Sequence, residues 1–321
     1  MKKLYLLIVL SLGFNSLIAQ NQNNPAFSES EITLKTKTGD IFGSLVVPDN
    51  MPTSPVVLII AGSGPTDRDC NSPMLLKTDA YKMLATALAK EGFSSLRYDK
   101  RGIAKSKAAM TQESEIRFEM YIQDAEEWIG LLKADRRFSG VIVLGHSEGS
   151  LIGMIAASGT EVKAFVSVSG VGQSADKILQ QQLKDKLPPG LLAESNSIMD
   201  SLRNGKTLVK VNPSLANLYR PSVQPYLISW MKYQPTDEIK KISVPVMIIQ
   251  GNRDLQVDIE EAKLLAKAKP DARLFLVVGM NHILKDAEAD AQKNLATYKD
   301  PSLPLKKEFV EGLLQFLKAV K

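Results

Sequence analysis

One short stretch carries the strongest chemical signal in this sequence: Gly145-His146-Ser147-Glu148-Gly149, which fits the pattern G-x-S-x-G. An apolar, strand-like run from Val141 to Leu144 precedes it, and a helical pattern from Leu151 to Ala157 follows. A serine on a sharp strand-to-helix turn needs small neighbours, because the backbone is strained and the side chain must stay exposed. We therefore expect Ser147 to be a nucleophile rather than a capping serine in a glycine-rich turn.

Two further stretches, together with this turn, carry a resemblance to a known family. One is Gly62-Ser63-Gly64-Pro65-Thr66-Asp67-Arg68-Asp69, and the other is Asp99-Lys100-Arg101-Gly102-Ile103-Ala104-Lys105-Ser106. They resemble the oxyanion loop and the D-x-R-G-x-G-x-S stretch of the α/β-hydrolase superfamily, closest to its esterase and serine-aminopeptidase-like branch. Ala61 and Ala104 stand where many members have histidine and glycine. The resemblance covers nearly the whole chain after its first residues, and it implies acyl transfer to a serine.

A serine nucleophile needs a base, and the chain has only two histidines. His146 is adjacent to Ser147, and neighbouring side chains on so tight a turn point apart. The other, His282, follows the last strand-like run in Gly279-Met280-Asn281-His282, which is where the family carries its base. We therefore expect His282 to take the serine proton.

The acid that orients this imidazole is expected to be Asp254. It follows the strand-like run Val244 to Gln250 and precedes His282, which gives the chain order Ser, Asp, His that this fold uses. Asp258 is the alternative, but it is better placed to cap a helix that begins near Ile259.

Tetrahedral intermediates need hydrogen-bond donors directed at the developing oxyanion. The backbone N–H of Glu148, directly after the nucleophile, is one candidate, and the resemblance implies that of Ser63 as the other. Arg68 is a candidate substrate contact, although it could instead brace this loop through ion pairs with its acidic neighbours. The loop lacks the patterns of phosphate-binding loops, so nucleotide binding is not expected.

The sequence contains few residues that could bind a metal ion or form a disulfide. Two histidines and one cysteine, without paired spacing, argue against zinc, and no cofactor is implied. Because Cys70 is the only cysteine, no internal disulfide can form, and we interpret it as a loop residue.

The elements that must position these residues have the pattern of an α/β protein. Short apolar runs alternate with helical periods such as Tyr81 to Leu88 and Leu305 to Val320. This alternation predicts a mostly parallel sheet with helices on both faces, and Ile32 to Val47 predicts an N-terminal β-hairpin around Thr38-Gly39-Asp40. The strand-like runs are Val56–Ala61, Ser95–Tyr98, Val141–Leu144, Ala164–Val168, Val244–Gln250 and Arg273–Val278.

One stretch, from about Gln173 to Thr236, breaks the alternation because it contains helical periods and prolines but no strand-like run. We expect residues 173–236 to form a helical cap inserted into an α/β-hydrolase core of residues 25–172 and 237–321. Tyr226 and Trp230, near the end of this stretch, are candidate contacts for an apolar substrate.

The first residues have the layout of a secretory signal peptide. Lys2 and Lys3 precede an apolar run from Leu4 to Leu12, and Ala19 offers a cleavage point. Asn15 and Ser16 interrupt the apolar run before the roughly 20 residues that span a bilayer, so no stable membrane insertion is expected. We expect residues 1–19 to be removed and the chain to be exported, to a periplasm or outside the cell.

Composition and charge narrow the function further. Hydrophobic residues make up 44% and charged residues 23%, which is typical of a folded globular protein, and the net charge of +5 includes no basic block that would suggest nucleic acid. The expected function is therefore hydrolysis of a small-molecule carboxylic ester through Ser147, His282 and Asp254. A peptidase or thioesterase on the same residues is the first alternative, and a non-catalytic binding protein on a hydrolase scaffold is the second.

Overall fold

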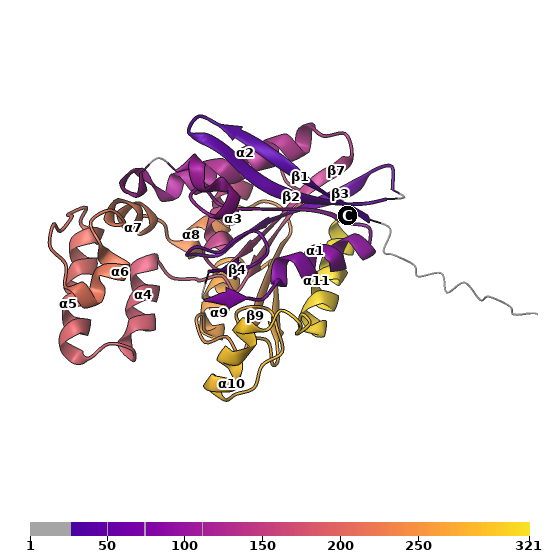
Figure 1. Cartoon of the computed structure of the whole chain (residues 1–321). Helices are drawn as coiled ribbons and strands as arrows, with labels where there is room; N and C mark the ends of the chain where they lie inside the picture. The colour runs from indigo at the N-terminus through magenta and orange to yellow at the C-terminus, as the bar shows by residue number, and fades with distance from the viewer. Residues whose placement is uncertain (1–26, 50, 74, 111) are drawn as a thin grey trace, which may run out of the picture.

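The computed structural model describes residues 27–321 except 50, 74 and 111, and in this part of the chain helices cover both faces of an eight-stranded sheet (Figure 1). The order of strands across the sheet is β1-β2-β6-β3-β7-β8-β9-β10. These strands are β1 (Phe27–Thr36), β2 (Gly39–Pro48), β3 (Ser54–Ile60), β6 (Ser94–Tyr98), β7 (Phe138–His146), β8 (Ala164–Val168), β9 (Val246–Gly251) and β10 (Arg273–Val277), while β4 (Asn71–Ser72) and β5 (Leu76–Lys77) form a separate short pair.

The pairing of the strands confirms the prediction of a mostly parallel sheet that begins with a β-hairpin. The first two strands form an antiparallel hairpin, with Thr36 opposite Gly39 at its turn, and β2 also runs antiparallel to β6. The remaining neighbours, from β6 to β10, are parallel. Parallel strands bring their carboxyl ends to one edge of the sheet, so the loops after β3, β6, β7 and β9 meet there.

Alternating residues of the central strands build two hydrophobic layers. Val56 and Leu58 of β3 pack with the helices α2 and α3 on one face, whereas Val57 and Ile59 pack with α1 and α11 on the other. The helices are α1 (Ala80–Lys90), α2 (Phe118–Ala134), α3 (Glu148–Gly159), α4 (Ala175–Lys184), α5 (Pro189–Arg203), α6 (Ala216–Tyr219), α7 (Gln224–Trp230), α8 (Pro235–Glu238), α9 (Ile259–Ala268), α10 (Ala291–Ala296) and α11 (Lys307–Val320).

The last predicted strand departs from the expectation that helices cover both faces of the sheet. β10 is at the edge of the sheet, where Leu274 and Leu276 are exposed and only Val277 is fully buried. An edge strand has a neighbour on one side only, so its apolar composition did not predict its position in the sheet.

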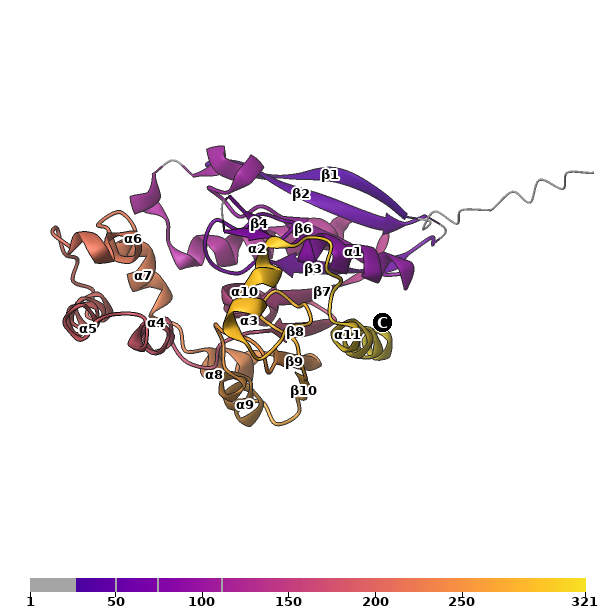
Figure 2. The same cartoon turned by 60° about the horizontal axis from the view of Figure 1, so that its bottom comes forward.

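The chain between β8 and β9 is helical, as the sequence predicts, and α4 to α7 stand together to one side of the sheet in both views (Figures 1 and 2). They enclose a small hydrophobic cluster of their own, which includes Met199, Leu202 and Tyr219. The predicted signal peptide, residues 1–19, lies outside the described residues.

Candidate active site

Ser147 occupies a strained turn between β7 and α3. Its backbone has φ 54° and ψ −120°, a conformation that L-residues rarely adopt and that costs about 1–2 kcal/mol. The flanking glycines are required by space, because a Cβ atom on Gly145 would lie 2.1 Å from the carbonyl oxygen of Gly149. A Cβ atom on Gly149 would in turn lie 2.3 Å from the carbonyl oxygen of Ile60. The G-x-S-x-G pattern therefore reflects close packing of the turn against β3.

His282 and Asp254 form a buried pair. The Nδ1 atom of His282 lies 2.8 Å from Oδ2 of Asp254, whose side chain has no exposed surface. The other oxygen of Asp254 accepts hydrogen bonds from the backbone N–H groups of Gln256 and Val257 at 2.8 and 2.9 Å. Burial by itself would raise the pKa of Asp254, but His282 and these N–H groups together lower it below its usual value. The carboxylate therefore stays ionised and holds a proton on Nδ1 of His282, which leaves Nε2 as the acceptor.

His282 lies beside the Ser147 turn. Its ring centroid is 4.7 Å from that of His146, the residue directly before the serine. Within the described residues no hydrogen bond joins the Ser147 hydroxyl to His282. Catalytic hydrogen bonds of this kind often form only when substrate is bound.

A histidine beside a serine suggests a base, but the ring of His146 makes structural hydrogen bonds. Its Nδ1 accepts a hydrogen bond from the Tyr81 hydroxyl at 2.7 Å, and its Nε2 donates to the backbone carbonyl of His282 at 2.8 Å. Burial lowers the pKa of His146 to about 3, so the ring is neutral at physiological pH. Both nitrogens are occupied, and His146 ties the turn to the main chain of His282. The spacing of Tyr81 on its helix predicted burial but gave no sign of this contact.

The two expected oxyanion donors lie on adjoining elements. Glu148 begins α3, so its backbone N–H is among those without an intrahelical partner. Ser63 follows β3, and the preceding Gly62 is so close to the turn that a Cβ atom there would lie 3.1 Å from Cβ of Ser147. Ser63, Ser147 and Glu148 line one cavity.

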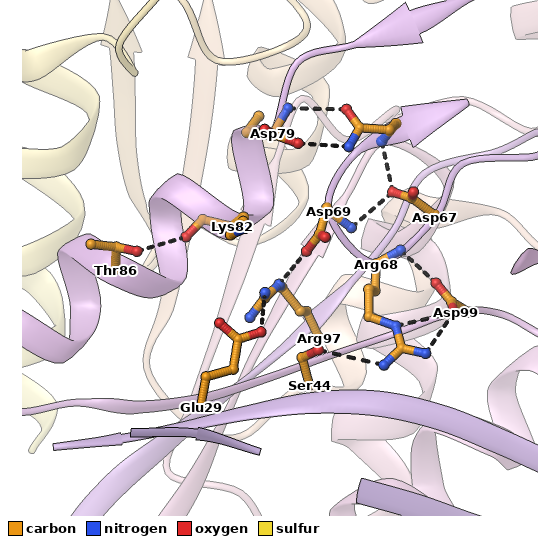
Figure 3. A network of polar contacts seen from close by, with 12 residues as sticks. Glu29, Ser44, Asp67, Arg68, Asp69, Asp79, Lys82, Thr86, Arg97 and Asp99 are labelled. Atoms are coloured by element: carbon orange, nitrogen blue, oxygen red, sulfur yellow. Dashed lines mark hydrogen bonds and ion pairs between the residues drawn. The ribbon is translucent and has the colours of Figure 1, made fainter. Parts of the chain in front are cut away.

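The loop after β3 is braced by a network of ion pairs (Figure 3). The backbone N–H and the guanidinium of Arg68 both donate to Asp99, at 2.8 Å and at 2.7–3.0 Å. Asp69 accepts from Nε of Arg97, whose NH2 group binds Glu29, at 2.6 Å each. Arg68 is buried and does not line the cavity, so the structure corrects its expected substrate contact in favour of the bracing alternative. Its guanidinium is already satisfied by Asp99.

The cavity has a volume of about 510 Å³ and lies between the Ser147 turn and the helices after β8. Tyr226 and Trp230 of α7, the two candidate substrate contacts, line it. Trp230 also stacks on Phe118 of α2, with ring centroids 6.0 Å apart and planes 12° apart. The side chain therefore both faces the cavity and fastens α7 to the core.

The remaining candidates show no second site. Cys70 is buried, which raises the pKa of its thiol to about 11 and keeps it protonated at neutral pH. Asp258, the alternative acid, accepts a hydrogen bond from the N–H of Glu260 at 2.9 Å and caps α9.

In the described part of the chain, no cluster of three or more His, Cys, Asp or Glu side chains could hold a metal ion. Nor is any described helix long and apolar enough to cross a membrane.

Comparisons with known proteins place this chain among esterase-like relatives in sequence and in fold. Esterase EstD of Thermotoga maritima is 25% identical over 268 residues, which are 82% of this chain but 61% of that protein. The chain thus spans about three fifths of this curated relative. Among solved structures, Est1E from Butyrivibrio proteoclasticus superposes with a TM-score of 0.58 at 17% identity, over 90% of this chain and 98% of that one. The Pyrococcus furiosus esterase Pf2001 gives 0.57 at 16% identity, over 91% and 93%.

These two structures share the fold with this chain. The family described as "Serine aminopeptidase, S33" matches residues 77–288, a stretch that contains the Ser147 turn, Asp254 and His282. The chain belongs to this family of α/β-hydrolases.

Proposed function

We propose that this protein is a serine hydrolase that cleaves small-molecule carboxylic esters. The observation that carries the proposal is the buried contact between Asp254 and His282, which is formed beside the strained Ser147 turn. A carboxylate that fixes the tautomer of an imidazole next to a serine that lines a cavity is the arrangement needed to activate that serine. The similarity to esterase EstD supports the ester as substrate.

In the proposed reaction, Ser147 Oγ attacks the ester carbonyl and Nε2 of His282 takes the hydroxyl proton. The carbonyl π electrons move to the oxygen, and the N–H groups of Ser63 and Glu148 stabilise the resulting oxyanion. The C–O bond to the alcohol then breaks as His282 returns the proton to the leaving oxygen. Water, activated by the same histidine, releases the acid from Ser147. No cofactor takes part in these steps.

The family's name raises an aminopeptidase as the second candidate. Such an enzyme must bind the positively charged amino terminus of a peptide, for which a free carboxylate is the usual partner. The acidic residues that line the cavity are Glu113 and Glu148, and each is already paired: Glu113 with Arg220, and Glu148 with Lys100. This pairing favours a neutral acyl group over a cationic one.

We also propose that the chain is exported after removal of residues 1–19, and that residues 173–236 act as the substrate-selecting cap of a core formed by residues 25–172 and 237–321. The cationic and apolar start of the sequence supports the first proposal. The separate hydrophobic cluster of α4 to α7, and their position over the cavity, support the second.

The test is to assay the purified protein lacking residues 1–19 against matched p-nitrophenyl esters, thioesters and aminoacyl p-nitroanilides, together with labelling by a fluorophosphonate. We expect labelling at Ser147 and the highest kcat/KM on esters. Preferred cleavage of thioesters or aminoacyl anilides would move the assignment to those alternatives. A protein that is folded but neither labelled nor active would support the non-catalytic binding alternative.

A further inference from the structure

Lys100 is a buried lysine that lines the cavity. Only 3% of its side chain is exposed, and its Nζ donates to the backbone carbonyl of Gly62 at 2.6 Å and to Oε1 of Glu148 at 3.1 Å. The same ammonium group lies 5.1 Å from the ring centroid of Tyr121. Burying an ammonium group is costly unless it is paired and hydrogen-bonded, so both partners are needed to keep it there.

The contact with Gly62 acts on an oxyanion donor. The carbonyl of Gly62 and the N–H of Ser63 belong to one planar peptide unit, in which C=O and N–H point in opposite directions. A hydrogen bond that holds the carbonyl therefore sets the direction of the Ser63 N–H. A cationic donor on the oxygen also polarises the unit, which strengthens the N–H as a donor.

The contact with Glu148 involves the residue that supplies the other oxyanion donor. Glu148 supplies the backbone N–H at the start of α3, and its own carboxylate, also 3% exposed, binds Lys100. One ammonium group thus joins the loop after β3 to the first residue of α3. Gly62 and Glu148 are far apart in the sequence, and Lys100 comes from a third segment, the loop after β6.

We propose that Lys100 is a positioning residue that sets the two oxyanion donors, Ser63 and Glu148, in their productive geometry. The inference rests on the proposed function, because it concerns the transition state of the same reaction. A packing role alone would predict loss of stability, and a substrate-binding role would predict a raised KM. A positioning role predicts a lowered kcat, because these donors contribute most when the oxyanion develops.

The experiment compares Lys100→Met with the wild-type protein, using p-nitrophenyl butyrate as substrate. Methionine keeps most of the apolar stem but removes the ammonium group. Loss of one whole oxyanion donor costs about 10²–10³-fold in kcat, so misdirected donors should cost about 10- to 100-fold, with KM nearly unchanged. A trifluoromethyl ketone with the same alkyl chain forms a tetrahedral adduct with Ser147, and its affinity should fall by the same factor. The matching methyl ketone, which binds without adding, should keep its affinity.

Two further variants make the test selective. Lys105→Met removes an exposed lysine of the same loop, which pairs with Glu31, and it should leave kcat unchanged. Glu148→Gln keeps the backbone N–H and the size of the side chain but removes the charge that holds Lys100, so it should lower kcat in the same way. It also keeps the proposal testable if Lys100→Met does not fold, because unchanged kcat in a folded Glu148→Gln variant would then overturn it.

The outcomes separate this inference from the proposed function. If Lys100→Met retains wild-type kcat, or weakens the two ketones equally, the inference is overturned while the esterase proposal stands. If the wild-type protein neither reacts with a fluorophosphonate nor hydrolyses any ester, the proposed function fails first and the inference fails with it.

Discussion

The imidazole of His146 donates a hydrogen bond from Nε2 to the backbone carbonyl of His282, at 2.8 Å. The residue before the proposed nucleophile thus holds the main chain of the proposed base, although the two histidines are 136 positions apart. Tyr81 donates to the other nitrogen, and because burial disfavours the charged imidazolium, the folded protein requires the neutral ring.

This requirement makes stability depend on pH. The pKa of His146 is about 3 in the folded protein and about 6.5 in an unfolded chain. Between these values the unfolded state binds a proton that the folded state does not, so the free energy of unfolding falls as the pH is lowered from 6.5 towards 3. The slope from this group approaches about 1.4 kcal/mol per pH unit. The stabilisation is fully present above pH 6.5.

Urea unfolding of the wild type and of His146→Gln, measured across this range, checks the prediction. Protonation of buried carboxylates such as Asp254, whose pKa is lowered, also reduces the free energy of unfolding in acid, and it does so in both proteins. The difference between the two curves therefore isolates His146. Parallel curves would show that the ring does not titrate as expected.

Removal of the proposed nucleophile should abolish activity without unfolding the protein. We expect Ser147→Ala to lower kcat by about 10⁴-fold or more and to prevent fluorophosphonate labelling, because no other group can form the acyl intermediate. The matched control is Ser158→Ala, which changes an exposed serine on α3, the helix that follows the Ser147 turn. Near-normal turnover by Ser147→Ala would rule out the proposed mechanism.

Substitutions of the two aspartates after β9 should have different effects on activity and on stability. Asp254→Asn keeps the size of the side chain but offers an amide where His282 needs a carboxylate, so kcat should fall by roughly 10⁴-fold, as in other triads. Asp258→Ala should instead remove the cap of α9 and cost about 0.5–2 kcal/mol of stability, with kcat intact. Steady-state kinetics and urea unfolding of both variants distinguish the roles. If the activity loss follows Asp258, the acid has been misassigned.

Because Trp230 lines the cavity, its removal should change KM by an amount that depends on the size of the acyl group. Trp230→Ala should raise KM for bulky acyl esters more than for acetyl esters, with a difference of ~1–3 kcal/mol, because the lost contact is apolar. Tyr233→Ala is the matched control, since Tyr233 also packs on Phe118 at 5.4 Å but does not line the cavity. It should lower the melting temperature without changing the preference for acyl length. If Trp230→Ala raises KM equally for both esters and lowers the melting temperature, Trp230 only packs α7 onto α2.

Ala104 marks a local strain that can be relieved. It stands where the family usually has glycine, and its φ is 42°, in the left-handed region. Alanine pays about 1–2 kcal/mol there, partly offset by the greater freedom of glycine in the unfolded chain. We expect Ala104→Gly to raise the free energy of unfolding by about 0.5–1 kcal/mol. Ala104 begins a 3₁₀ helix, Ala104–Ala109, and Ala108→Gly in that helix, at a residue without positive φ, should lower the free energy of unfolding by about 0.5–1 kcal/mol.

Local patterns in the sequence determined the fold and singled out the candidate residues. Alternating apolar runs and helical periods indicated the order of strands and helices, because burial on a sheet face or along a helix stripe has a fixed period. The glycines around Ser147 indicated a tight turn, since only they allow the close packing seen at Gly145 and Gly149. His282 was identified because His146 is the chain's other histidine and because His282 stands where the resembling family carries its base, and Asp254 because it follows a strand-like run in the order Ser, Asp, His.

Only the tertiary structure decided which polar side chains meet. Arg68 binds Asp99 rather than facing the cavity, and Lys100 of the loop after β6 binds both Gly62, in the loop after β3, and Glu148, at the start of α3. Asp254 contacts His282, whereas Asp258, four residues later, caps a helix. A hydrogen bond depends on distance and direction to within a few tenths of an ångström. Periodicity in the sequence specifies which face a residue occupies, and the packing of segments distant in sequence then fixes its partner.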